Sequence, residues 1–172
     1  MGNREDLLRG AKQCLVERGW SNTTVRDIAA SAGVSHAAIG YHFGSRERLL
    51  VEALMEELDE LDARMAPDGG SAAPADRWRA LIDSFATDKA LWTSQLEAIV
   101  AAQRNDELRA RLAEGQRRAR SDMGGSIPLA ILIGLMVQSL IDPDSAPSAA
   151  QAITEMRELA NGRMETPPRS RL

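Results

Sequence analysis

The sequence predicts an all-α protein. Apolar residues recur at intervals of three and four along most of the chain, and residues typical of helix ends separate these stretches. No alternating apolar and polar run is long enough to predict a strand. With 172 residues, 44% of them hydrophobic and 27% charged, the chain is long enough for one sizeable core or for two small subdomains that share a surface.

The first two predicted helices end at glycines. The first covers about residues 4–18 and stops at Gly19. Its apolar face consists of Leu7, Ala11, Cys14 and Leu15. Thr24 and Asp27 have the spacing of a capping box at the start of the second helix. That helix ends at Gly33, because glycine accepts the left-handed backbone of a helix end.

Two serines are predicted to cap the third and fourth helices. Ser35 precedes a helix whose Ile39 and Phe43 face inward, and Ser45 precedes a longer one. The acids of the run EELDELD occupy the outer faces of this longer helix. Its apolar stripe comprises Leu50, Leu54, Leu58, Leu61 and Met65. Residues 67–75 are rich in Pro, Gly, Ser and Ala, which predicts a loop or linker.

Five further helical patterns follow the linker. They cover about residues 76–86, 89–103, 106–123, 127–140 and 149–161. The breaks between them are Asn105, Gly124 with Gly125, and the segment 142–147. The uncharged run 126–141 is shorter than the roughly 18 residues that a membrane span needs, so it predicts a buried helix and no membrane association.

The charge of the chain is unevenly distributed. The whole chain carries −4, but residues 1–50 carry +2 and the remainder −6. A nucleic-acid partner for the N-terminal part is therefore compatible with the composition. Cys14 is the only cysteine, which excludes an intrachain disulfide, and the early charges in MGNREDLLRG do not fit a signal peptide. These features predict a cytoplasmic protein.

The second and third predicted helices have the pattern of a helix-turn-helix. Such spacing also arises in helical bundles that do not bind DNA, so the residues that follow are needed to decide. Arg46 lies in the first turn of a helix capped by Ser45, where free N–H groups and a cation together suit a phosphate. Tyr41 and His42 are placed to donate hydrogen bonds to a sugar-phosphate backbone. Together these features favour DNA binding.

The stretch TTVRDIAASAGVSHAAIGYHFGSRERLL, residues 23–50, resembles the TetR family of transcriptional regulators, most specifically in its ending YHFGSRERLL. The rest resembles the family in outline, with an apolar helix IGLMVQSLIDPD near its end. The resemblance implies a three-helix bundle with a helix-turn-helix over residues 1–48 and a helical ligand-binding and dimerisation domain over 49–172. It implies a homodimeric repressor that a small-molecule effector releases from double-stranded operator DNA, in a bacterial cytoplasm and at the nucleoid while bound. The join at residues 124–126 is shorter than the resemblance leads us to expect.

The resemblance also implies roles for individual residues. Thr24 and Arg26 would contact phosphate, and Tyr41, His42 and Arg46 would hold the DNA backbone. The residues that would face the major groove are Ser35, His36, Ala37, Ala38 and Gly40. Small side chains would let the helix lie deep in the groove, where even alanine contacts a thymine methyl. Many members have an aromatic residue at the position of Gly40, so no operator sequence can be transferred.

Two expectations concern the second domain. The resemblance favours a largely apolar effector pocket there, although the same aromatic residues also fit a simple core. The expected pocket residues are Leu58, Trp78, Leu81, Phe85, Trp92, Leu96 and Ile99. The apolar run 127–141 predicts a homodimer formed by the last two helices, because such a helix needs cover on every side. The expected interface residues are Ile131, Gly134, Leu135, Gln138, Ile141, Ile153 and Met156.

Other functional classes have less support in the sequence. An enzyme is not expected, because there is no nucleophile beside a base, no paired carboxylates and no Gly-rich phosphate loop. No cofactor is expected, and no metal, because no Cys or acid lies at ligand spacing from His36 or His42. Two alternatives remain open. A ligand-independent DNA-binding regulator would have a collapsed second domain, and a helical protein-interaction module would lack salt-dependent DNA affinity.

Overall fold

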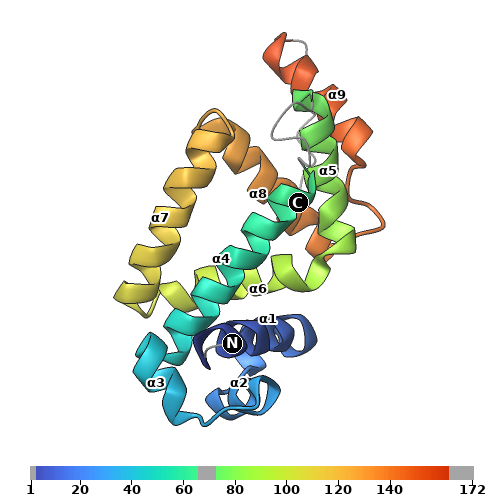
Figure 1. Cartoon of the computed structure of the whole chain (residues 1–172). Helices are drawn as coiled ribbons and strands as arrows, with labels where there is room; N and C mark the ends of the chain where they lie inside the picture. Colours follow the sequence, from blue (N-terminus) through green and yellow to red (C-terminus); the bar gives the residue numbers. More distant parts are fainter. Residues whose placement is uncertain (1–2, 66–72, 163–172) are drawn as a thin grey trace, which may run out of the picture.

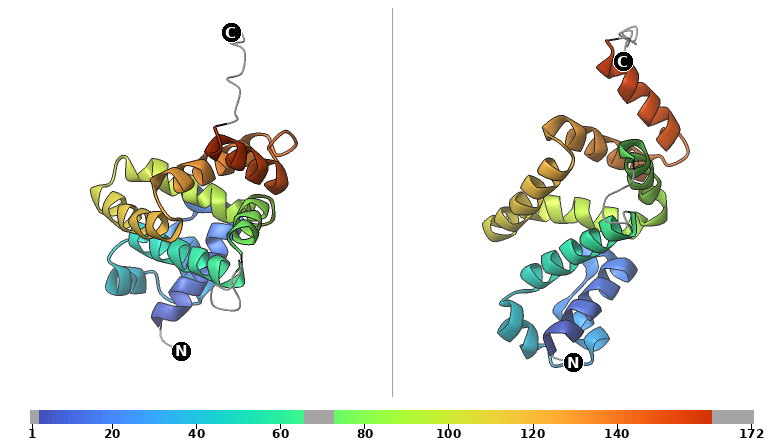
Figure 2. Two further views of the ribbon diagram at one scale, coloured as in Figure 1. Left: turned by 90° about the horizontal axis from the view of Figure 1, so that it is seen from above. Right: turned by 45° about the horizontal axis from the view of Figure 1, so that its top comes forward.

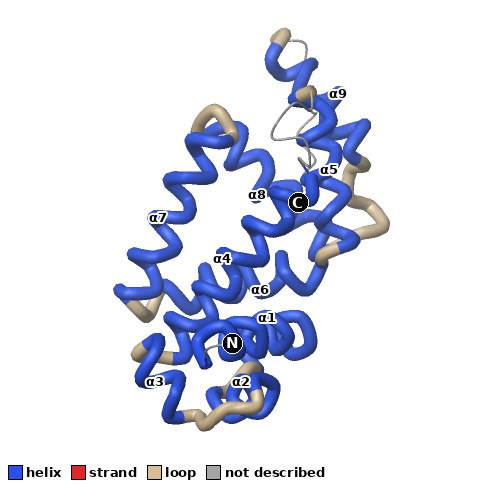
Figure 3. Tube along the Cα trace, in the orientation of Figure 1, coloured by secondary structure: helices blue, strands red, loops and turns tan. Residues whose placement is uncertain are grey.

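The computed structural model describes residues 3–65 and 73–162. Within these ranges the chain forms nine α-helices and no strand, which confirms the all-α prediction (Figure 3). Four helices precede the gap: α1 (Asn3–Asn22), α2 (Val25–Ala32), α3 (Ala37–Phe43) and α4 (Arg46–Met65). Five follow it: α5 (Pro74–Thr87), α6 (Lys89–Ala102), α7 (Asp106–Asp122), α8 (Ser126–Ile141) and α9 (Ala149–Ala160). Most of the predicted linker lies outside the described residues, and Pro74 begins α5.

The first three helices and the first half of α4 form an N-terminal head, residues 3–54. In the head, α1 packs against both α2 and α4, and α3 packs against α4 (Figure 1). Its most deeply buried side chains include Leu7, Ile28, Leu49, Leu50 and Leu54. A Cβ atom on Gly10 would lie 2.9 Å from the backbone nitrogen of Ala32, so α1 and α2 cross too closely for any side chain there.

The predicted caps at Thr24, Gly33 and Ser45 agree with the structure. The predicted end of the first helix at Gly19 is corrected to a kink, because Gly19 is non-helical with φ of 76° but α1 continues beyond it to Asn22. The Thr24 hydroxyl accepts a hydrogen bond from the N–H of Asp27 at 3.2 Å, and the Asp27 carboxylate accepts one from the N–H of Thr24 at 2.9 Å. Gly33 has the left-handed conformation, with φ of 68°. The hydroxyl of Ser45 accepts a bond from the N–H of Arg48 at 3.1 Å. The Ser35 hydroxyl likewise accepts one from the first residue of α3, Ala37, at 3.3 Å.

Helix α4 continues from the head into the second domain without a break, as two views show (Figures 1 and 2). Helices α5, α6 and α7 pack against α4, and α8 packs against α5, α6 and α7. The chain bends by 111° between α7 and α8. Gly124 and Gly125 make this possible, because their φ angles of 78° and 141° lie where other residues are strained. These two glycines explain how so short a join reverses the chain.

The expectation that the run 126–141 is a buried helix is wrong for the single chain. Leu129, Leu132 and Met136 of α8 are buried, but Ile127 and Ile141 are 70% and 79% exposed. The reason is that α9 packs mainly against α5, so one face of α8 has no cover from the described residues. Within the described residues, no single helix is both long and apolar enough to cross a membrane.

Candidate functional site

Helix α3 presents an outer face of small and polar residues. Ile39 and Phe43 are buried against the head, which turns the opposite face of the helix to solvent. Ala38 and His42 are half-buried at its edges. The fully outward residues are Ser35, His36, Ala37, Gly40 and Tyr41. Tyr41 is 86% exposed, so its ring and hydroxyl face solvent.

Within residues 3–65 and 73–162, nothing requires a glycine at position 40. Its φ angle is not positive, and a Cβ atom added there would meet none of the described atoms within 4 Å. Glycine within a helix is about 1 kcal/mol less favourable than alanine. The benefit of Gly40 is therefore expected outside the chain, on the surface that α3 turns to a partner.

The start of α2 supplies a second exposed polar group. Thr24 and Arg26 both face solvent, and Arg26 has no acidic partner within the described parts of the chain. The Thr24 hydroxyl donates to Asp27 at 2.6 Å, and Arg18 lies 3.3 Å from the same carboxyl group. These bonds from Thr24, and then the charge of Arg18, hold the pKa of Asp27 below its usual value. The Asp27 carboxylate therefore stays ionised at mildly acidic pH, and the capping box weakens only as pH falls through that lowered pKa.

The structure corrects the role expected for Arg46. Its guanidinium points back into the head, where Nε donates to the carbonyl of Thr23 and Nη2 to the carbonyl of Trp20. It also lies 5.9 Å from the centre of the Trp20 ring and pairs with Glu47 at 3.1 Å. Because these contacts use most of its donors, Arg46 holds the connection between α1 and α2 and is not free for a phosphate.

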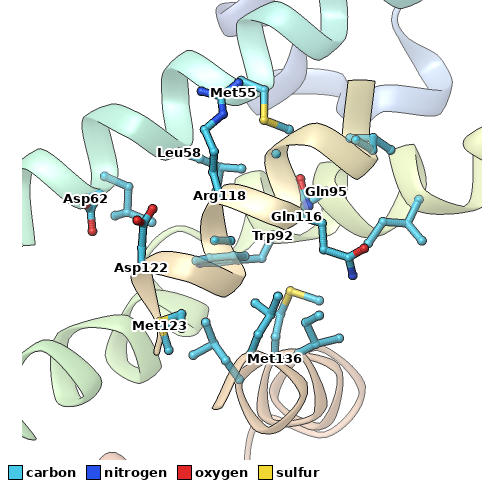
Figure 4. A pocket seen from close by; sticks show the side chains of 18 of the residues that line it. Met55, Leu58, Asp62, Trp92, Gln95, Gln116, Arg118, Asp122, Met123 and Met136 are labelled. Carbon is cyan, nitrogen blue, oxygen red and sulfur yellow. The ribbon is translucent and has the colours of Figure 1, made fainter. Parts of the chain in front are cut away.

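A cavity of about 410 Å³ lies between α4, α5, α6, α7 and α8 (Figure 4). Five of the seven expected pocket residues line it, namely Leu58, Leu81, Phe85, Trp92 and Ile99. Trp78 and Leu96 do not line it and pack instead against the core. Each follows directly after a lining residue, Arg77 or Gln95, and one residue along a helix turns a side chain by about 100°.

Most of the other lining residues were not predicted from the sequence. They come from α4, α6, α7 and α8 and include Met55, Gln95, Leu112, Gly115, Gln116, Met123, Leu132, Ile133 and Met136. On α7, a stripe of apolar and small residues at helical spacing could have indicated the lining residues. The stripe consists of Leu108, Leu112, Gly115 and Ala119. The small residues of this stripe allow α7 to approach α4 closely, because a Cβ atom on Gly115 would lie 3.0 Å from the sulfur of Met55 on α4.

Helix α6 touches the cavity with one face and the head with the other. Trp92, Gln95 and Ile99 line the cavity. On the other side, the Ser94 hydroxyl is 3.4 Å from the carbonyl of Leu15, and Glu97 accepts a hydrogen bond from the N–H of Ser21 at 2.8 Å. A second link between the two domains is the ion pair of Arg48 on α4 with Glu107 on α7. Helix α6 thus connects the cavity wall with the helices of the head.

The residues expected at a dimer interface lie mainly on the uncovered face of α8. Ile131, Gly134 and Leu135 are half-buried, while Gln138 and Ile141 are exposed. Met156 on α9 is also half-buried. Ile153 is a correction, because it is already buried within the single chain, on the helix that packs against α5.

Comparison with known proteins gives consistent matches. The family model for bacterial regulatory proteins of the tetR family matches residues 7–53. The HTH-type transcriptional regulator BetI of Rhizobium meliloti (strain 1021) is 32% identical over 161 residues, which cover 89% of this chain and 73% of that protein. The HTH-type transcriptional repressor AcnR of Corynebacterium efficiens is 25% identical over 170 residues, covering 90% and 86%.

The same fold occurs in a solved structure. The multidrug binding protein EbrR, complexed with proflavin, superposes with a TM-score of 0.67 over 92% of this chain and 99% of that one. Its sequence identity is 22%, so this similarity bears on the fold alone. The matches extend across both the head and the second domain.

Proposed function

Because this chain belongs to the TetR family of transcriptional regulators, we propose that α3 contacts operator DNA in the major groove and that a small molecule in the cavity releases it. Membership of the family makes the protein a DNA-binding transcriptional regulator rather than an enzyme. Repression is the mode that relatives such as AcnR support. A regulator that acts on bacterial DNA would be located in the cytoplasm, and at the nucleoid while it is bound to DNA.

The outer face of α3 is the observation that carries the DNA-binding part of the proposal. Its small residues leave room for close approach, and His36 is the longest polar side chain at its start. We assign base contacts to Ser35, His36, Ala37, Ala38 and Gly40, and backbone contacts to Thr24, Arg26, Tyr41 and His42. A phosphate looks the same at every sequence, so the second group would position the helix and the first would give specificity.

The cavity supports an effector-responsive regulator over a ligand-independent one. A collapsed second domain was the expectation of the ligand-independent alternative, whereas this chain has a space of about 410 Å³ with largely apolar walls. The complex of EbrR with proflavin shows that a protein of this fold takes up a small molecule. Because α6 contacts both the cavity and α1, a molecule that displaces α6 would change how the head is held.

The proposed organisation has two parts joined by α4. Residues 1–48 form the DNA-binding domain and 49–172 the effector-binding and dimerisation domain, with the boundary inside α4. A homodimer through α8 and α9 would cover the exposed side chains of α8 and place two copies of α3 on half-sites one helical turn apart, about 34–36 Å. Effector binding would favour a geometry in which the two copies no longer fit both half-sites.

The experiment is selection of operators from a random DNA pool, followed by affinity measurements on labelled fragments. His36→Ala should cost about 1–3 kcal/mol per half-site at one base position and relax the preference there. Tyr41→Phe, the control, should weaken specific and non-specific sites by similar factors. Binding that selects no sequence and does not weaken with salt would favour the protein-interaction module instead. If no compound both raises the melting temperature and weakens operator binding, the ligand-independent alternative takes its place.

A further inference from the structure

Two side chains that line the cavity each carry a buried polar atom without a hydrogen-bond partner among the described residues, the Oε1 atom of Gln95 and the Nε atom of Arg77. Gln95 lies on the cavity face of α6, close to Trp92 (Figure 4). Its Oε1 atom is buried and accepts no hydrogen bond from any described residue. A buried acceptor without a donor costs about 1–3 kcal/mol, and folded proteins leave few of them. This oxygen therefore points to a donor that comes from outside the chain.

The walls around Gln95 are apolar and can hold the body of a small molecule. The rings of Phe85 and Trp92 meet edge to face at 5.2 Å, and Met136 of α8 is buried at the same cavity. The indole N–H of Trp92 is already used, because it donates to the Ser84 hydroxyl at 3.1 Å. Trp92 therefore offers an apolar surface, and Gln95 offers the polar contact beside it.

The ionised side chains at the cavity do not select a charged molecule. Three carboxylates, Asp59, Asp62 and Asp122, are balanced by three guanidinium groups, Arg77, Arg109 and Arg118. Asp62 is bonded to Arg77 at 2.7 Å, and Arg109 pairs with Asp106. Arg77 is half-buried, with its Nε atom enclosed. The other five groups are exposed and lie toward solvent. Asp59 and Asp122 have no ion-pair partner among the described residues, but both are exposed. A charge carried deep into the cavity would therefore lose its hydration without reaching a counter-charge there.

We propose that the cavity binds an uncharged, largely apolar molecule whose hydroxyl or N–H group donates a hydrogen bond to Gln95 Oε1. This inference rests on the proposed sensor function and adds the chemical class of its ligand. The volume lies near the lower end of the range for ligand pockets, about 300–1,000 Å³, so a compact body of one or two rings fits. The bond would form on α6, two residues from Glu97, which contacts the head.

The test uses three naphthalene probes and isothermal titration calorimetry on the full chain. 2-Naphthol has a hydroxyl donor, 2-methoxynaphthalene has the same body without a donor, and 2-naphthyltrimethylammonium adds a fixed positive charge. We expect the wild type to bind 2-naphthol about tenfold more tightly than 2-methoxynaphthalene, equal to about 1.4 kcal/mol. We expect the cation to bind more weakly than both.

Gln95→Leu should remove the tenfold preference while the two neutral probes still bind. Gln95→Met, of similar length, gives a second variant if the leucine substitution impairs folding. Gln116→Leu is the matched control, because Gln116 lines the cavity from α7 but is exposed, and this variant should keep the preference. Equal binding of the neutral probes to the wild type, a preference that survives in both Gln95 variants, tighter binding of the cation, or no binding of any probe would each overturn the proposal.

Operator affinity, measured with the same samples, separates this proposal from the sensor function. If the preference depends on Gln95 but no probe changes operator affinity, the ligand class stands and the sensor function fails. If another compound releases operator DNA equally from wild type and Gln95→Leu, the sensor function stands and the role of Gln95 is refuted.

Discussion

The carboxylate of Glu97 on α6 accepts a hydrogen bond from the backbone N–H of Ser21, with 2.8 Å between Glu97 Oε2 and Ser21 N. Ser21 lies in the last turn of α1, beyond the non-helical Gly19 and three residues before the cap of α2. Arg46 holds the same connection from α4. The start of α2 is therefore fixed by two helices of which one, α6, also forms the cavity wall.

Glu97→Ala is expected to weaken the coupling between cavity and operator. It removes the direct bond from α6 to the connection before α2, and such changes alter coupling by about 0.5–2 kcal/mol. The measurement is operator affinity by fluorescence anisotropy, with and without a compound that releases the wild type. Glu158→Ala, which changes an exposed glutamate on α9, is the control. If Glu97→Ala loses operator affinity on effector binding by the same factor as the wild type, α6 does not carry the signal through this contact.

Arg46 and Arg26 are expected to differ in what their loss affects. Arg46→Ala leaves the carbonyls of Trp20 and Thr23 without donors in a region where both residues are buried, so the free energy of unfolding should fall by about 1–3 kcal/mol. Arg26→Ala should change stability by less than about 0.5 kcal/mol. It should instead flatten the plot of log affinity against log salt by about one unit per subunit.

Urea denaturation and salt titration of operator binding distinguish these two effects. Arg46→Lys is a further variant, because it keeps the charge but lacks the fork that reaches two carbonyls, so it should also be destabilised. An Arg46→Ala protein as stable as the wild type, with a reduced salt dependence, would restore the phosphate contact first expected for this residue.

The head was predictable because its signals are local. The bonds between Thr24 and Asp27, and the left-handed Gly33, each depend on residues within a few positions of one another. The direction of the Arg46 side chain depends on Trp20 and Thr23, which precede it by more than twenty positions and meet it only in the folded chain. Its place in the first turn of α4 could not reveal that its donors are already used.

The cavity was predictable only in part, for a related reason. The family resemblance favours Phe85 and Trp92 as pocket residues, but which side of α5 faces the cavity depends on packing against α8 and α9. A shift of one residue along a helix separates Arg77, which lines the cavity, from Trp78, which does not. In the same way, no pattern shows that one oxygen of Gln95 lacks a partner, because this follows from every neighbour at once.

The exposed face of α8 is expected to form the dimer. Ile141→Glu should leave the stability of the single chain nearly unchanged, since this side chain is 79% exposed in it. In the dimer the substitution would bury a charge where an apolar group is expected, so the dissociation constant of the dimer should rise at least about tenfold. Light scattering over a concentration series measures this. Val100→Glu on α6, another exposed apolar position, is the control, and a wild-type monomer at micromolar concentration would refute the prediction.

Gly40→Ala is expected to separate the stability of the protein from its affinity for DNA. The added methyl meets no atom within 4 Å in the part of the chain that the structure describes, so the gain in helix propensity should raise the free energy of unfolding by about 0.5–1 kcal/mol. On operator DNA the same methyl would enter a close contact. Forcing a methyl into a packed contact costs about 1–3 kcal/mol, and affinity should fall by that amount per half-site.

The aromatic residue that many family members carry at this position would hold α3 farther from the groove, so we expect this chain to approach DNA more closely. Ser121→Ala on α7 is the control for helix propensity, because Ser121 is exposed and lies outside both α3 and the expected dimer interface. Both variants should melt at higher temperature, but only Gly40→Ala should lower the affinity of a preformed dimer for its operator. A Gly40→Ala protein with full operator affinity would show that α3 does not approach DNA closely at this residue, and that its glycine has no role in recognition.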